Sequence, residues 1–126
     1  MSKSPGHQQH PEHRVDERHL DQRMTVSVNG EIVADSRDVI RVDEGKYPSR
    51  FYFPRADVKM DKLLPSTKTT ECPFKGTARY FSISAGGKEL KDSVWSYETP
   101  YDEHVELAGR VAFYDDKMPE ILVRPA

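Results

Sequence analysis

Two segments of the sequence concentrate side chains that could do chemistry. The first is TTECPFKGTARYF at 69–81, which holds the chain's only cysteine, Cys72, with Glu71 before it and Lys75 three residues on. A thiolate is a nucleophile, and Lys75 would favour its formation while Glu71 would oppose it. Free cysteines are usually buried and unreactive, so Cys72 is predicted to be a packing residue. Lys75, which leaves a turn, is the stronger candidate because its ammonium group can contact an anionic ligand.

The second segment is WSYETPYDEH at 95–104, which combines aromatic rings with acidic and imidazole groups. Aromatic walls with a few polar groups are typical of small-molecule pockets, and Trp95 and Tyr97 could form such walls. The alternative is that these two rings fill the core and cover a sheet edge. Glu98 and His104 could act as an acid–base pair, and His104 is also the candidate base for a cysteine nucleophile.

The other charged clusters favour structural explanations. Arginine in a strand either pairs with a carboxylate or presents its planar fork to an anion, and pairing is the favoured reading for Arg50, Arg55, Arg79 and Arg110. Acidic pairs at segment ends could offer oxygen ligands to Mg²⁺ or Ca²⁺, but they are more often solvated loop ends, as we expect for Asp102, Glu103, Asp115 and Asp116.

The histidines near the start of the chain are spaced for a metal but lie in a polar segment. His7, His10 and His13 follow one another at three-residue steps, which could bring two imidazoles to zinc or nickel if a turn formed. The composition around them favours an unstructured tail instead. Glycine-rich phosphate loops, GxSxG and CxxC are also missing from the sequence. We therefore predict no metal ligand and no cofactor.

Composition limits the partners and the location of the protein. Lys and Arg total 19 and Asp and Glu total 21, a net charge of −2, so the basic excess that holds a nucleic-acid backbone is missing. The first residues lack the apolar stretch of a secretory signal, and no run of residues approaches the length of a membrane span. We expect a cytoplasmic protein that binds neither nucleic acid nor membrane.

The elements that must position these residues are mostly short strands. Residues 1–23 form a His-rich polar tail, mobile or docked, and residues 24–126 form one β domain. Asn29-Gly30 predicts a tight hairpin, because both residues tolerate the positive φ of such a turn. Alternating patterns and turn residues predict strands at 24–28, 31–35, 39–43, 50–54, 76–84, 92–98, 110–116 and 120–125.

Helical turns are expected at only two places, 55–66 and 101–109. In the first, Val58, Leu63 and Leu64 should point inward. About eight short strands with so little helix indicate a mainly β fold, a single compact antiparallel sandwich or barrel-like domain.

Five ordered blocks of the sequence resemble the small, mostly bacterial family called domain of unknown function 427. The blocks are GEIVADS at 30–36, RFYFPRADV at 50–58, TTECPFKGTARYFS at 69–82, WSYETPYDEH at 95–104 and AGRVAFYDDK at 108–117. The resemblance implies a compact, mainly β single domain. The family has also carried a nucleotidyltransferase-like label, but the chain lacks the glycine-serine turn and paired strand aspartates that a two-metal transferase needs.

The residues inside these blocks that turn geometry does not explain are the best candidates for a site. They are Lys75, Trp95, Tyr97, His104 and Arg110. We expect a domain that binds a small anionic molecule in an aromatic-lined pocket. The alternatives are a small hydrolase- or transferase-like enzyme that uses His104 with Cys72 or a carboxylate such as Glu98, and an oligomeric or partner-binding module that uses edge strands.

Overall fold

The Asn29-Gly30 pair forms the hairpin that the sequence predicts. In the computed structural model, which describes residues 2–126, Asn29 and Gly30 have φ angles of 45° and 87°. They join β2 (Met24–Val28) to β3 (Glu31–Ser36), which pair antiparallel. β10 (Ile121–Pro125) pairs with the other edge of β2, which gives a three-stranded sheet in the order β10-β2-β3.

A second three-stranded sheet joins the N-terminal segment to the body of the protein. Its order is β1-β4-β5, from β1 (Val15–His19), β4 (Ile40–Glu44) and β5 (Arg50–Tyr52). β1 lies within the segment that the sequence assigns to a polar tail, and it pairs with β4 along all five of its residues. Helix α1 (Pro5–Gln9) precedes it, and its N-terminus is capped by the Ser4 side chain.

The third sheet has four strands in the order β6-β7-β8-β9. They are β6 (Leu63–Cys72), β7 (Gly76–Ala85), β8 (Lys88–Tyr97) and β9 (Val111–Phe113). The helical stretch expected at 55–66 is limited to two 3₁₀ turns, η1 (Arg55–Asp57) and η2 (Met60–Lys62). Leu64 already belongs to β6 and is exposed rather than inward. A third turn, η3 (Asp102–Leu107), occupies the other helical stretch.

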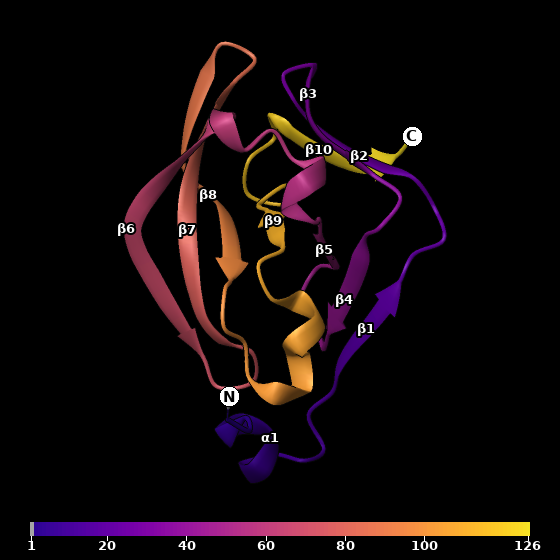
Figure 1. Cartoon of the computed structure of the whole chain (residues 1–126), viewed down its shortest axis with the longest axis vertical. Coiled ribbons are helices and arrows are strands. Elements are labelled where there is room, and N and C mark those ends of the chain that lie inside the picture. The colour runs from indigo at the N-terminus through magenta and orange to yellow at the C-terminus, as the bar shows by residue number, and fades with distance from the viewer. Residues whose placement is uncertain (1) are drawn as a thin grey trace.

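Successive residues of the four-stranded sheet are buried on opposite faces. Phe81 and Val94 belong to one apolar cluster, whereas their neighbours Tyr80 and Trp95 belong to a second cluster. Because side chains alternate along a strand, the sheet is covered on both faces. Figure 1 shows β6, β7 and β8 of this sheet on the left and strands β1, β2 and β4 of the other two sheets on the right, with β5 and β9 in the centre. An isolated bridge from Phe53 to Val111 connects the two sides.

The fold class is therefore the predicted one, a compact, mainly β and antiparallel domain with few and short helical segments. Residues 2–126 form ten strands in three sheets, where the sequence indicates about eight, and these sheets do not close into a barrel. Among the helices of residues 2–126, none is long and apolar enough to cross a bilayer.

Candidate ligand-binding site

A cavity of about 590 Å³ lies between strands β4 and β5 and the face of the four-stranded sheet that carries Tyr80 and Trp95. Its size falls within the range of small-molecule sites, about 300–1,000 Å³. We call it the aromatic cavity, because its lining contains seven aromatic side chains: Tyr47, Tyr52, Phe74, Tyr80, Trp95, Tyr97 and Tyr114.

The register of β7, β8 and β9 explains why these rings gather on one face. Tyr80 is opposite Trp95, and the next pair along the same face is Ala78 opposite Tyr97. On the other side of β8, Ala112 is opposite Trp95. Directly opposed residues share a face, so large rings alternate with alanines. We infer that the small alanine side chains leave space beside the rings.

Hydrogen bonds fix the rings in the wall of the cavity. The Trp95 indole nitrogen donates to the Tyr52 hydroxyl at 3.1 Å, and the two rings meet edge to face at 87°. The Tyr80 hydroxyl lies 3.4 Å from that of Tyr114. Burial raises the pKa of Tyr52 and of Tyr97, and burial together with Tyr80 raises the pKa of Tyr114 to about 12. These hydroxyls are thus neutral at pH 7 and can donate or accept.

Arg50 occupies one end of the cavity. Its guanidinium lies 5.1 Å from the Trp95 ring centroid and 5.2 Å from that of Tyr114, and its Nη1 donates to Asp116 Oδ1 at 2.6 Å. This hydrogen bond lowers the pKa of Asp116, whereas burial raises the pKa of the neighbouring Asp115. Arg50 is therefore held both by aromatic faces and by a carboxylate.

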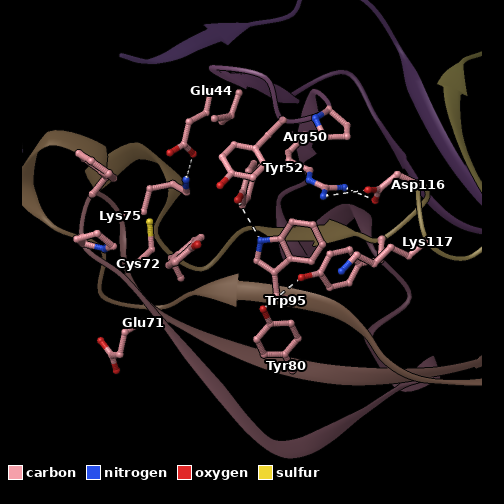
Figure 2. Close-up of a pocket in the computed structure, with 17 residues that line it drawn as sticks. Glu44, Arg50, Tyr52, Glu71, Cys72, Lys75, Tyr80, Trp95, Asp116 and Lys117 are labelled. Carbon is pink, nitrogen blue, oxygen red and sulfur yellow. Dashed lines mark hydrogen bonds and ion pairs between the residues drawn. The ribbon is translucent and has the colours of Figure 1, made fainter. Parts of the chain in front are cut away.

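Lys75 occupies the other end and is only 7% exposed. Its Nζ donates to Glu44 Oε1 at 2.5 Å, and the second Glu44 oxygen accepts from His13 Nε2 at 2.8 Å. Burial tends to raise the pKa of Glu44, but the contacts with Lys75 and His13 outweigh it, and the net effect is a lowered pKa. Figure 2 shows the Lys75–Glu44 and Arg50–Asp116 pairs on opposite sides of Trp95.

The structure brings four of the predicted site residues to this cavity. Lys75, Trp95 and Tyr97 line it, and so does Cys72, which is half-buried and packs against the same apolar cluster. Figure 2 shows the Cys72 sulfur on the Lys75 side of the cavity.

The other predicted site residues lie elsewhere. Arg110 donates to the carbonyl and carboxylate of Asp38, at 2.7 and 3.1 Å, and does not line the cavity. Glu98 pairs with Arg55 at 3.0 Å. His104 is buried next to the N-terminal segment.

Of the three catalytic candidates, Glu98 and His104 have different hydrogen-bond partners in the described residues. His104 is hydrogen-bonded to Glu17 and to His7, not to Glu98 or Cys72. Within residues 2–126, no hydrogen bond or ion pair joins any two of Cys72, Glu98 and His104.

Over the part of the chain that the structure describes, no three His, Cys, Asp or Glu side chains are arranged as metal ligands. Asp116 is instead bound to Arg50, and the exposed His10 ring faces Glu12 at 3.5 Å.

Several cavity residues were not among the sequence candidates. Glu44 ends β4, Tyr52 ends β5 and Tyr114 follows β9, so they meet the β8 residues only through the tertiary fold. Arg50 was considered, but as a partner of a carboxylate, and that pairing is present. A usable signal exists for one of them, because AGRVAFYDDK at 108–117 places Tyr114 in the same resembling block as Arg110.

The fold and the cavity together define a class of protein: a mainly β domain with an aromatic, internally ion-paired cavity. The family model described as "Domain of unknown function (DUF427)" matches residues 16–124, so the chain belongs to this family. A search of the curated proteins found no match.

Proposed function

We propose that the protein binds a small, planar organic anion in the aromatic cavity. The observation that carries the proposal is Lys75, a buried ammonium group in the lining of a cavity whose walls are mostly aromatic. Aromatic faces favour a flat apolar body, and a buried cation favours an acidic group at its edge.

Both cations retain donors for such an anion. The Lys75 ammonium has three N–H donors, of which Glu44 uses one, and Arg50 has five, of which Asp116 uses two. In this proposal Arg50 supplies the second positive charge, in place of Arg110, because Arg110 is already bound to Asp38 outside the cavity.

The charge balance of the lining favours a monoanion over a polyphosphate. Three acidic side chains, Glu44, Glu71 and Asp116, face three basic ones, Arg50, Lys75 and Lys117. A di- or triphosphate needs an excess of positive charge or a metal ion to neutralise it. A carboxylate needs only one or two charge-assisted hydrogen bonds.

A pair of matched probes tests the proposal. Benzoate and indole-3-carboxylate would be compared with their neutral amides, and binding would be followed through Trp95, which is the only tryptophan in the chain. We expect each carboxylate to quench or shift Trp95 fluorescence and to raise the melting temperature. The amides should bind about 10- to 100-fold more weakly, because a hydrogen bond to a charged group contributes about 1.5–3 kcal/mol.

Two lysine variants locate the charge. Lys75→Met should remove the preference for carboxylate over amide, whereas Lys91→Met, at an exposed position of β8 outside the cavity, should keep it. The proposal is overturned if no carboxylate changes either readout, or if Lys75→Met binds carboxylates as well as the natural chain.

A further inference from the structure

The N-terminal segment packs against the turn that carries Lys75. We call residues 2–14 the strap. The Gly6 N–H donates to the Pro73 carbonyl at 2.8 Å, and the Ser4 hydroxyl donates to the same oxygen at 2.7 Å. The His13 ring stacks on Phe74, with centroids 3.9 Å apart. Figure 1 shows α1, which belongs to the strap, at the end of the molecule where β6 and β7 are connected.

The fit at Gly6 leaves no room for a larger residue. A Cβ atom there would lie 2.7 Å from the Pro73 carbonyl oxygen and 2.8 Å from Phe74 Cδ1, closer than real contacts allow. The Gly6 backbone is helical, so an alanine would suit its conformation and only the contact would oppose it. The strap is therefore docked through a close backbone-to-backbone contact.

A pair of histidines holds the strap from the other side. His7 Nε2 lies 2.9 Å from His104 Nε2, and the ring centroids are 5.1 Å apart, so the two nitrogens point at each other. His104 Nδ1–H donates a hydrogen bond to the Glu17 carboxylate. His104 Nε2 is then the acceptor, and His7 Nε2–H is the donor.

If both rings were charged imidazolium ions, neither Nε2 could accept the hydrogen bond, and two positive charges would be in contact. The charged groups around His7 come from every packed element: Glu103 and His104 from η3, His13 from the strap itself, and Glu44 from β4. Glu17 of β1 faces His104, through the hydrogen bond to Nδ1.

The strap is linked to the cavity by two routes. Pro73 and Phe74, which it contacts, also line the cavity next to Lys75. His13 donates to Glu44, and Glu44 in turn holds the Lys75 ammonium. Release of the strap would therefore free both the turn and the carboxylate that position Lys75.

We propose that the strap is a proton-operated clamp on the aromatic cavity. It is docked while His7 and His104 share a single bridging proton, and it leaves when both rings are charged, which loosens Lys75 and weakens ligand binding. The effect on ligand rests on the proposed function, whereas the docking equilibrium does not.

The direction of the pH dependence follows from the docked environment. Burial and the neighbouring His104 lower the pKa of His7, partly offset by Glu103 and Glu44. A released His7 returns to about 6.5, so protons bind the released state better. Docking is at full strength above about pH 6.5 and weakens as the pH falls below it. A protonated His13 acts in the opposite sense through its attraction to Glu44.

Amide hydrogen exchange measures the docking without any ligand. The Gly6 amide should lose about tenfold of its protection, after correction for intrinsic exchange, between about pH 7.5 and pH 5.5. His7→Gln should make this protection independent of pH, whatever the absolute level of protection in the variant. His10→Gln, which changes an exposed ring of the same segment, should keep the natural pH dependence. Protection that is flat with pH in the natural chain, or unaltered in slope by His7→Gln, overturns the clamp.

Benzoate binding then tests the coupling. Gly6→Ala should release the strap at every pH and weaken benzoate binding about fivefold or more at about pH 7.5. The natural chain should bind benzoate with this same weaker affinity at about pH 5.5. If benzoate binds Gly6→Ala and the natural chain equally well, the coupling is wrong and the proposed function stands. If benzoate binds neither, the proposed function fails, and the exchange experiment alone decides the docking.

Discussion

Glu44 is the residue through which the cavity and the N-terminal segment communicate. It ends β4, where one carboxylate oxygen holds Lys75 and the other holds His13. Its side chain is 14% exposed and that of Lys75 is 9% exposed, so water does little to screen the pair. Removing one partner of such a pair costs more than the pair itself contributes, because the other charge is left buried.

Glu44→Gln should therefore lower the free energy of unfolding by about 2–4 kcal/mol, measured by urea denaturation at neutral pH. The pKa of Glu44 is lowered in the folded protein, so its contribution is complete above about 4.3, the ordinary value of a glutamate, and is lost as the pH falls below that. The difference between the natural chain and the variant should shrink accordingly in acid.

The matched control is Asp16→Asn, which breaks an exposed pair with Arg14 and should change the stability by no more than about 0.5 kcal/mol. Equal effects of the two substitutions, or a Glu44→Gln difference that persists unchanged into acid, would contradict this account of Glu44.

The sequence allows cavity residues to be predicted on only one side of the cavity. Lys75, Trp95 and Tyr97 could be chosen because their types and local spacing are visible in two short segments. Tyr52 and Glu44 could not, because they join the site through the approach of β4 and β5 to β8, which no local pattern encodes. His104 and Arg110 have suitable types as well, but their partners, Glu17 and Asp38, are distant in sequence.

At the scale of elements, the strands that could be predicted from the sequence are those with a clear pattern of buried apolar residues. β2 and β3 were evident from alternating residues around Asn29-Gly30, and β7 from a run of buried aromatic and aliphatic residues. β6 was missed, because it is an edge strand and, of its ten residues, only Leu63 is buried. A strand without a buried face carries little hydrophobic signal.

Two adjacent glycines test how the sheets are held together. Gly86 and Gly87 form the β7–β8 turn, with φ angles of +58° and +75°. A Cβ atom on Gly86 would lie 2.2 Å from the Val28 carbonyl oxygen of the β2–β3 hairpin, whereas one on Gly87 would meet nothing within 4 Å. The turn is thus seated against the neighbouring sheet at Gly86 alone.

Gly87→Ala should cost about 1–2 kcal/mol, the strain of a left-handed residue with a side chain. Gly86→Ala should cost about 1–3 kcal/mol more, since it must also push the two sheets apart. Both are measured by chemical denaturation. Equal losses would show that the contact between the turn and Val28 contributes nothing to the stability.

At the scale of the whole molecule, the four-stranded sheet makes the two apolar clusters interdependent. Neighbouring residues such as Tyr52 and Phe53, or Val111 and Ala112, belong to different clusters. Neither cluster can lose its packing without disturbing the strands that form the other. The sequence predicted the antiparallel β class but not this sharing of one sheet, because it depends on which sheets face each other.

The domain should accordingly unfold as a single unit. Trp95 fluorescence reports the second cluster and far-UV circular dichroism reports all strands, and their urea transitions should coincide, with a slope of about 1–3 kcal/mol per molar urea. Transitions that separate by more than the experimental error would show that the cavity side unfolds independently.

The exposed edge of β6 affects the tendency of the protein to aggregate at high concentration. Ten residues long and at the end of its sheet, this strand offers unpaired backbone groups on which a second chain could add a strand. Pro65 interrupts that row of donors, the pairing shifts register between Pro65 and Thr69, and Lys68 adds a charge. These are the devices by which β proteins resist edge-to-edge aggregation, so the least patterned strand of the fold also carries the features that oppose the addition of a second chain.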